Sequence, residues 1–391
     1  MDGKFSLLLW DAQGNEICHN SSVRSKPDLL CDDVDDILFD YEKMASKVKE
    51  ISGSEVKAMK QISVHHYTVI DAITEDSRHF MIRVAEVDEA SDLNIVQDNL
   101  RRECEVMKWI SFSTALPIPH LHYYAVDEPY PYMITSKCDS ILLADNFGRF
   151  PFEAKITNIR SYAQIAIELF RMNAPEGIGS LFSFECATDS QSHSMILGPS
   201  VMDDDPPTVV PSITEYFKWL LKTKRSSSKI GTAEEDVKEA RSALNRLERL
   251  VLDWISGYDT AILRWIPSHE DFGAHNVLVD ASGLITAVLD WEFHMVQPAV
   301  LGVSYPSWIR YDGCYDPQFI DPHNAAFEVW FTTRADAAKL REIYDEITQE
   351  MDPDYYRALK KGEFCRAAKE WLHPDLDDPG CRRLSAWMDS L

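Results

Sequence analysis

A short stretch in the second half of the chain contains histidine, acidic and amide side chains close together. His269 and Asp271 are followed by four residues and then by Asn276, and Asp290 lies 14 residues beyond Asn276. One carboxylate in such a set can meet an acceptor hydroxyl, while an amide oxygen and a second carboxylate can hold Mg²⁺, which prefers oxygen ligands. This is the spacing of a catalytic loop for phosphoryl transfer, a reaction that requires mainly positioning and charge compensation from the protein.

A β-hairpin is expected to position these side chains. The turn-forming residues 280–283 separate two short apolar runs, and Asp290 ends the second run. A loop followed by a hairpin can bring Asp271, Asn276 and Asp290 around one point. The literal Asp-Phe-Gly at 271–273 precedes Asn276, so it belongs to the loop, and Asp290 is the better metal ligand. A zinc site is disfavoured, because His269 and His275 are six residues apart instead of four on one helical face.

With these residues the chain resembles the aminoglycoside phosphotransferase and choline kinase-like family, particularly its fungal members, over roughly residues 55 to 315. The loop of that family is similar to His-Gly-Asp-x-x-x-x-Asn, followed by Ile-Asp-Trp or Asp-Phe-Glu. The resemblance implies an α+β, bilobal protein-kinase-like fold with a β-rich N-terminal lobe and a mainly helical C-terminal lobe. It also implies an ATP-dependent phosphotransferase that uses Mg²⁺ and a small-molecule alcohol as acceptor.

The resemblance carries roles onto individual residues of the loop and the hairpin. Asp271 corresponds to the catalytic base or hydroxyl-orienting residue, and His269 corresponds to the structural anchor of the catalytic loop. Asn276 and Asp290 correspond to the magnesium ligands.

The same resemblance extends to the predicted N-terminal lobe. Arg83 lies in a strand where the family has its phosphate-contacting basic residue, and Glu103 is its expected partner on the next helix, with Glu105 as an alternative register. Residues 133–137 correspond to the hinge on the adenine side of the nucleotide, which makes Ile134 and Ser136 candidate nucleotide-binding residues.

Three departures from the family pattern keep a second reading open. Arg83 stands where Lys is commoner, and residues 61–67, which would cover the nucleotide, contain no glycine. Glu270 replaces a glycine beside Asp271, and like-charge repulsion is expected to raise the pKa of Asp271. The alternative is therefore a pseudokinase-type binding or regulatory module with weak or no phosphotransfer.

Aromatic and acidic residues after Asp290 are candidates for the acceptor site. Glu292, Trp308 and Tyr311 could form part of an aromatic and acidic box for an amine, although core packing explains the aromatic residues equally well. The identity of the acceptor cannot be read from the sequence. A protein acceptor is disfavoured, because no Ala-Pro-Glu segment follows Asp290.

Composition narrows the partners and the location. The formal net charge of −25 over 391 residues argues against nucleic acid and fits, weakly, a cationic acceptor. The longest apolar runs fall far below the roughly 20 residues of a membrane-spanning helix, so no membrane partner is expected. The eight cysteines form no C-x-x-C pair, which favours reduced thiols and a cytoplasmic location. The sequence is silent on the oligomeric state.

Hydrophobic periodicity indicates a β-rich part followed by an α-rich part. Together with the resemblance, this order implies three segments: an N-terminal extension (1–32), a nucleotide-binding lobe (33–135) and a C-terminal lobe (136–391) with the catalytic loop, metal site and acceptor site. Strand-like runs cover 57–73 and 79–85. The helix opening at Thr232 has a capping-box pattern. Helices are predicted at 33–50, 94–110, 158–173, 212–224, 232–256, 322–349 and 354–372.

Overall fold

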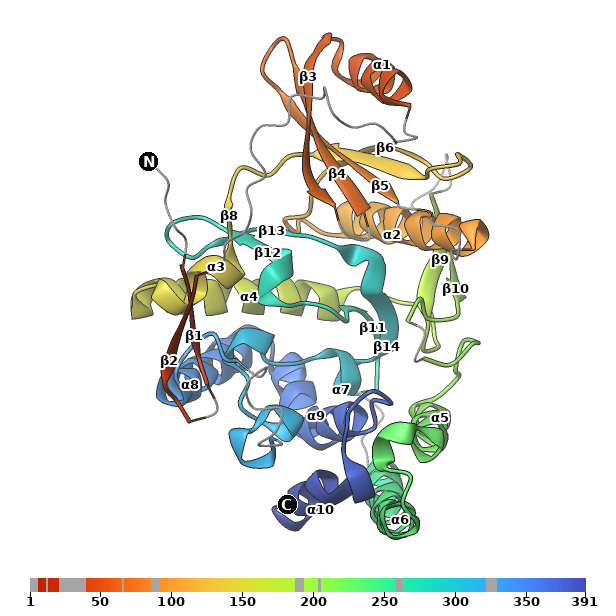
Figure 1. Cartoon of the computed structure of the whole chain (residues 1–391), viewed down its shortest axis with the longest axis vertical. Helices are drawn as coiled ribbons and strands as arrows, with labels where there is room; N and C mark the ends of the chain where they lie inside the picture. Colours follow the sequence, from red (N-terminus) through yellow and green to blue (C-terminus); the bar gives the residue numbers. More distant parts are fainter. Residues whose placement is uncertain are drawn as a thin grey trace.

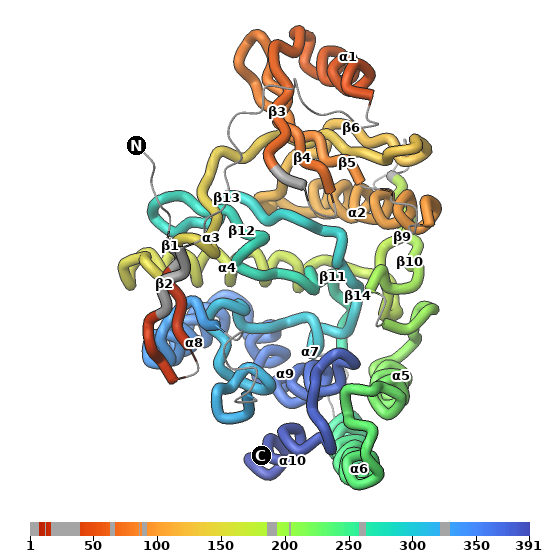
Figure 2. The backbone as a smooth tube through the Cα atoms, in the orientation of Figure 1, coloured from red at the N-terminus to blue at the C-terminus, as the bar shows by residue number. Residues whose placement is uncertain are grey.

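The computed structural model describes residues 6–11, 13–20, 40–64, 67–85, 87, 92–186, 193–202, 205–257, 263–320 and 329–391. It has two lobes, and Figure 1 shows a β-rich lobe above a mainly helical one, as the sequence predicts. The smooth backbone trace in Figure 2 shows the hairpin of β12 and β13 lying where the two lobes meet.

A five-stranded antiparallel sheet forms the upper lobe. Its strands follow the order β3-β4-β5-β7-β6. The predicted run 57–73 is two strands, because residues on both sides of 65–66 pair with each other as β3 and β4. The strands are β3 (Val56–Val64), β4 (Tyr67–Thr74), β5 (His79–Ala85), β6 (Leu121–Ala125) and β7 (Tyr132–Ser136).

One helix covers each face of this sheet. Helix α1 (Tyr41–Ser52) buries Met44 and Val48 against one face; the predicted start at residue 33 lies outside the described residues. Helix α2 (Leu93–Ser113) lies on the other face and is longer than predicted. Successive side chains of a strand point to opposite faces, so Ile82 faces α1 while Arg83 faces α2.

The lower lobe consists mainly of helices around one apolar core, in which Trp291, Trp308 and Trp371 are fully buried. The predicted capping box does not form, because α6 begins at Glu234 after Ala233 without a side-chain cap. Within the described residues the helix predicted at 322–349 begins at Arg334, where Thr333 caps it; the predicted start at 322 lies outside the described residues. The helices are α3 (Leu143–Asn146), α4 (Phe152–Arg171), α5 (Ile213–Ser226), α6 (Glu234–Ser256), α7 (Ala299–Gly302), α8 (Arg334–Met351), α9 (Pro353–Trp371) and α10 (Arg382–Asp389).

Short strands frame the candidate loop. β11 (Trp265–His269) pairs with β14 (His294–Pro298), and β12 (Val277–Val279) pairs with both β13 (Ile285–Val288) and β8 (Ile141–Leu142). A further hairpin of β9 (Ser180–Cys186) and β10 (His193–Gly198) contacts α2.

The turn between β12 and β13 rests on α4. Gly283 has a φ of 88°, and a Cβ there would lie 2.3 Å from the carbonyl oxygen of Ala154, so this close approach requires glycine. Asn158 also donates a hydrogen bond to the carbonyl of Gly283. These contacts fix the hairpin that carries Asp290 at its end.

The described part of the N-terminal extension packs on the lower lobe. Strand β1 (Ser6–Trp10) pairs with β2 (Glu16–Asn20), and Trp10 and Trp330 exchange two backbone hydrogen bonds of 2.9 and 3.0 Å. Trp10 and Trp330 form a small apolar cluster with Ile320. Among the described helices of the chain, none is long and apolar enough to cross a membrane.

Candidate active site

His269 ties the loop after β11 to the end of the β12–β13 hairpin. Its Nε2 donates to the carbonyl of Leu289 at 2.9 Å, and its Nδ1 accepts from the backbone N–H of Asp271 at 3.2 Å. Burial lowers the pKa of His269, so the neutral ring with one donor and one acceptor suits both contacts. The ring therefore holds Asp271 at a fixed distance from the residue that precedes Asp290.

Asp271 is held by two neighbours in the same loop. Its Oδ2 accepts from Nδ2 of Asn276 at 2.9 Å and from Nε2 of His275 at 3.1 Å. Burial opposes its ionisation, but the hydrogen bond and positive charge of His275 outweigh burial, and the pKa of Asp271 lies below its ordinary value. The expected increase in the pKa of Asp271 is therefore wrong.

The reason is the direction of the Glu270 side chain. Glu270 is turned toward the lower lobe, where its carboxylate contacts Lys369 at 2.5 Å, Ser268 at 2.8 Å and Gln297 at 2.5 Å. Burial opposes ionisation of Glu270, yet Lys369 holds the pKa of Glu270 below its ordinary value. Its charge is neutralised locally instead of repelling Asp271.

Asn276 and Asp290 are joined through the hairpin backbone. The N–H of Leu289 donates to the carbonyl of Asn276 at 2.8 Å, and Asp290 follows directly in a left-handed conformation with φ 63°. Among the described residues, no group of three or more His, Cys, Asp or Glu side chains could by itself hold a metal ion. One carboxylate with an amide oxygen still suits Mg²⁺, which usually takes one or two protein carboxylates plus phosphate oxygens.

Arg83 connects the two lobes. Its Nη1 lies 2.7 Å from Glu103, and its Nη2 lies 2.8 Å from Asp290 and 3.3 Å from Glu292. The guanidinium also stacks on the ring of Tyr67 at 3.8 Å. Of the two registers left open, the structure has Glu103 as the partner of Arg83.

Glu105, the alternative partner predicted for Arg83, makes other contacts. Glu105 accepts hydrogen bonds from Lys108, the hydroxyl of Tyr124 and the backbone N–H of Phe184. It therefore links α2 to β6 and β9, away from Arg83.

Glu103 is buried in this cluster without full compensation of its charge. Its side chain is buried at 2% exposure, and its Oε2 has no hydrogen-bond partner. Burial raises the pKa of Glu103 to about 8; the attraction of Arg83 is not sufficient, because Asp290 and Glu292 add negative charge. One guanidinium thus faces three acidic side chains, and the folded protein relieves their repulsion by keeping a proton on Glu103.

This cluster makes folding stability depend on pH. Between the ordinary pKa of 4.5 and the folded pKa of about 8, the folded protein retains a proton on Glu103 that the unfolded chain releases. This contribution to stability is fully present below pH 4.5 and is lost as pH rises through 8, at roughly 1 kcal/mol per pH unit. In Glu103→Gln, whose amide oxygen can still accept from Arg83, urea unfolding should lack this slope.

The matched control is Glu50→Gln, which removes an exposed acid from α1. It should keep the wild-type slope. Identical slopes in wild type and Glu103→Gln would contradict the protonation assigned to Glu103.

The three acceptor candidates do not come together around one point. Glu292 accepts from the hydroxyl of Tyr67 at 2.5 Å and lies beside Arg83. Trp308 is in the core, where its Nε1 donates to Asn158 at 3.0 Å. Tyr311 stacks on Trp330. Trp308 packs in the core and also lines the cavity beside Asp271, whereas Glu292 belongs to the Arg83 cluster.

The side chains of the two hinge candidates lie on the face opposite Arg83. Ile134 pairs with Ile82 and packs in the cluster beneath α1, whereas Arg83 pairs with Met133. Ser136 lies in the same phase as Ile134, and its hydroxyl contacts His122 at 2.8 Å. A one-residue shift changes the face of a strand, so Met133 is the β7 side chain that shares a face with Arg83.

A cavity of about 440 Å³ adjoins Asp271. This volume is in the range of small-molecule sites. Its walls combine aromatic rings with charged groups. The residues that line it include Tyr162, Glu270, Asp271, His275, Ser304, Tyr305, Trp308, Arg310, Trp330, Phe331, Arg366, Lys369 and Glu370.

Three side chains that contact the site residues were not predicted from the sequence: His275, Tyr67 and Lys369. The four-residue spacing of Asp271 and His275 could have indicated their contact, since Gly273 leaves room for the ring: a Cβ there would lie 2.4 Å from it. Tyr67 and Lys369 are far from their partners along the chain and carry no local signal.

Comparisons with known proteins give one relative in sequence. No family model matches the chain. The clavilactone A biosynthesis cluster protein Y of Ampulloclitocybe clavipes is 30% identical over 354 residues, which cover 88% of this chain and 86% of the relative.

Solved structures give distant likenesses. An ADP-bound aminoglycoside phosphotransferase, APH(2'')-Ib, has a TM-score of 0.49 at 13% identity and covers 90% of this chain and 98% of its own. An ethanolamine kinase of Plasmodium vivax has a TM-score of 0.46 at 12% identity, over 85% and 82%. By its sequence relative, which is 30% identical over most of both chains, the chain belongs to the family of the clavilactone A biosynthesis cluster protein Y.

Proposed function

We propose that this protein is a magnesium-dependent small-molecule kinase that transfers the γ-phosphate of ATP to a hydroxyl group. The proposal rests mainly on the position of Asp290, which lies between the catalytic loop with Asp271 and Asn276 and the Arg83 side chain of the other lobe. Asp271 and Asn276 are tied to the hairpin that ends at Asp290, and Asp290 contacts Arg83 from the other lobe. A cavity of small-molecule size opens beside Asp271.

In this proposal Asp271 orients the acceptor hydroxyl and takes its proton. The acceptor oxygen forms a bond to the γ-phosphorus, the bond from that phosphorus to the bridging oxygen breaks, and the electron pair leaves with ADP. The lowered pKa of Asp271 keeps its carboxylate ionised at neutral pH, so it can accept the hydroxyl hydrogen bond. His269 acts as a positioning residue, because it touches the loop and not the acceptor.

Asn276 and Asp290 would hold Mg²⁺, and Arg83 would contact the nucleotide phosphates. When bound, Mg²⁺ supplies positive charge against the phosphate oxygens. The chain fits this group because its donor set consists of oxygens, and because the Asp290 carboxylate shares the single guanidinium of Arg83 with Glu292. Glu103 fixes the position of Arg83 from α2.

The direct test is incubation with ATP, Mg²⁺ and a panel of hydroxylated metabolites. We expect a mass increase of one phosphate on at least one acceptor, together with release of ADP. The name of the sequence relative places that protein in a biosynthesis cluster, which supports a metabolite as acceptor. ATP hydrolysis that no acceptor accelerates would count against the proposal.

The contact of His275 with Asp271 predicts a change in pH dependence. Because His275 helps to hold the pKa of Asp271 down, His275→Ala should raise that pKa and move the acid limb of kcat/KM to higher pH. His275→Gln, whose amide can donate to Asp271, should keep the limb near its wild-type position. Rates measured from about pH 2.5 to 7, a range that includes the ordinary pKa of an aspartate, check this, and an unmoved limb in His275→Ala would exclude the role of His275.

One observation favours the alternative of a binding module with weak or no transfer. Arg83 is already paired with Asp290 and Glu292, so the side chains proposed for phosphate and metal neutralise one another. Thermal unfolding separates the two functions. Ligand at about 100 times Kd adds about 2.7 kcal/mol to the stability of a protein that binds it only when folded. The absence of any shift with ATP and Mg²⁺ would favour the alternative.

A further inference from the structure

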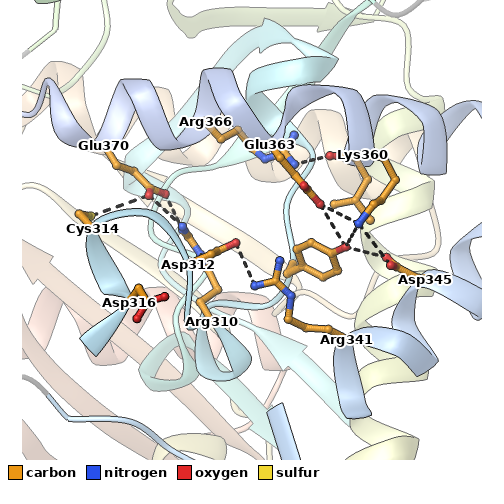
Figure 3. Close-up of polar contacts among 12 residues, drawn as sticks. Arg310, Asp312, Cys314, Asp316, Arg341, Asp345, Lys360, Glu363, Arg366 and Glu370 are labelled. Carbon is orange, nitrogen blue, oxygen red and sulfur yellow. Dashed lines mark hydrogen bonds and ion pairs between the residues drawn. The ribbon is translucent and has the colours of Figure 1, made fainter. Parts of the chain in front are cut away.

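The cavity beside Asp271 adjoins a second cavity of about 380 Å³. The two share four lining residues: Ser304, Tyr305, Arg310 and Arg366. Arg366 comes from α9 and Arg310 from the segment after α7. Figure 3 shows the charged side chains around this junction.

Ion pairs neutralise most of the Arg and Lys side chains that line the two cavities. Each of these cations lies within 3 Å of a carboxylate, and Figure 3 draws most of the pairs. The pairs are Arg310 with Glu370 at 2.5 Å, Lys369 with Glu270 at 2.5 Å, Arg341 with Asp312 at 2.9 Å and Lys360 with Glu363 at 2.8 Å. Lys361 lines only the second cavity, and it is exposed.

Arg366 differs from these cations. Its side chain is 8% exposed, and among the described residues it forms no ion pair with a carboxylate. Its three hydrogen bonds go to the backbone carbonyls of Val300, Ala358 and Leu359. A guanidinium has five N–H donors, so at least two remain without a protein acceptor. Burial lowers the pKa of Arg366, although the nearby charges of Glu363 and Asp312 act in the opposite direction without making an ion pair with it.

The backbone of α9 makes room for this guanidinium. A Cβ at Gly362 would lie 2.2 Å from Nη1 of Arg366 and 2.3 Å from the carbonyl oxygen of Val300. Glycine inside a helix costs about 1 kcal/mol relative to alanine. Helix α9 thus contains a glycine that disfavours the helix, and this glycine makes room for the buried charge of Arg366. Arg366 lines both cavities.

We propose that Arg366 binds a carboxylate of the acceptor, so that the acceptor is a hydroxy acid whose hydroxyl reaches Asp271. This inference rests on the proposed kinase function and names its substrate class. The cavity that holds both groups is walled by aromatic side chains, including Tyr162, Trp308 and Phe331, which suit an apolar or aromatic body. A cationic acceptor, which the net charge of the chain weakly favours, would place its charge next to a buried arginine without a carboxylate partner.

The positive charge of Arg366 and the negative net charge of the chain act on an acceptor at different stages of binding. The net charge of −25 acts on a ligand in solution, whereas Arg366 acts on the bound ligand inside a cavity with little screening. A hydrogen bond to a charged group contributes about 1.5–3 kcal/mol. That range corresponds to a preference of about 10- to 100-fold for a carboxylate over an uncharged equivalent.

The test uses three matched probes: para-hydroxymethyl phenylacetate, its methyl ester, and the corresponding phenethylamine. With wild type, ATP and Mg²⁺, we expect kcat/KM for the acid to exceed that for the ester and the amine by at least about tenfold. Equal or better use of the ester or the amine would overturn the inference.

Binding separates failure of this inference from failure of the proposed function. The same probes are titrated calorimetrically into Asp271→Asn. Tight binding of the acid alone, without phosphorylation of any probe by wild type, would support the carboxylate site and count against the kinase. Equal binding of acid and ester would overturn the carboxylate site, whatever the rates.

Variants assign the preference to Arg366. Arg366→Met should lose the preference for the acid while its affinity for the ester is unchanged, and Arg366→Lys should retain part of the preference. Arg357→Met removes the same charge from the same helix outside both cavities and should behave as wild type. If Arg366→Met fails to fold, Arg366→Lys and the wild-type probe series still decide. A full preference for the acid in Arg366→Met would overturn the role of Arg366.

Discussion

Asp271→Asn is expected to lose phosphoryl transfer by about 10²- to 10⁴-fold in kcat, the usual contribution of a positioned acid or base. An amide has nearly the shape of a carboxylate, and its oxygen can still accept from Asn276 and His275. It can neither take the hydroxyl proton nor carry the negative charge that orients the hydroxyl. Because Asp271 does not contact Arg83 or Glu103, nucleotide affinity should be preserved.

The measurement compares turnover on the best acceptor with ATP affinity from calorimetry. Asp280→Asn is the matched control, since Asp280 lies in the neighbouring turn, is half-buried, and uses one oxygen to accept from Ser282 and Leu284, as an amide also can. It should retain wild-type turnover. Undiminished turnover in Asp271→Asn would reject the role of Asp271, and an equal loss in Asp280→Asn would show a structural effect.

Asp290→Asn is expected to abolish the Mg²⁺ dependence of nucleotide binding. Loss of a group that only supports a metal ligand typically weakens metal binding by 10- to 100-fold, so loss of a direct ligand should weaken it by at least about 100-fold. Asn tolerates the left-handed backbone that Asp290 adopts at φ 63°, which makes this substitution gentler on the fold than alanine. Arg83 keeps Glu103 and Glu292 as partners.

Calorimetric titration of ATP with and without Mg²⁺ checks this expectation. Wild type and Asp280→Asn should bind ATP more tightly when Mg²⁺ is present. In Asp290→Asn the two titrations should coincide. A retained response to Mg²⁺ in Asp290→Asn would place the metal elsewhere in the protein.

The fold and the centre of the candidate site could be predicted because their signals are local. The spacing from His269 to Asp290 lies within one loop and one hairpin, whose geometry follows from a short apolar pattern and a tight turn. The pair of Arg83 with Glu103 was also predicted, with one alternative register. The sequence could not decide between Glu103 and Glu105 as the partner of Arg83, because the choice depends on how α2 is rotated against the sheet. In the structure, α2 directs these two side chains toward different neighbours.

Other features depend on contacts that no local pattern encodes. The charge of Glu270 is compensated by Lys369, which is 99 residues away, so its effect on the pKa of Asp271 was predicted with the wrong sign. The side chain of Ile134 packs on the α1 face of the sheet, a direction that depends on strand register and not on any local pattern, and its role at the hinge stays a prediction. The burial of Trp308 depends on contacts with α4 and Phe272 that no local pattern indicates, and its role at the acceptor site stays a prediction.

The central claim is that Asp271, Asn276, Asp290 and Arg83 form one site for nucleotide, metal and acceptor. It is tested most directly by a crystal structure of the protein with a non-hydrolysable ATP analogue and Mg²⁺. We predict that Asn276 and Asp290 bind the metal, that Arg83 contacts the phosphates, and that the terminal phosphate faces Asp271 across the mouth of the cavity. A nucleotide bound elsewhere, or bound here without a metal between Asn276 and Asp290, would contradict the claim.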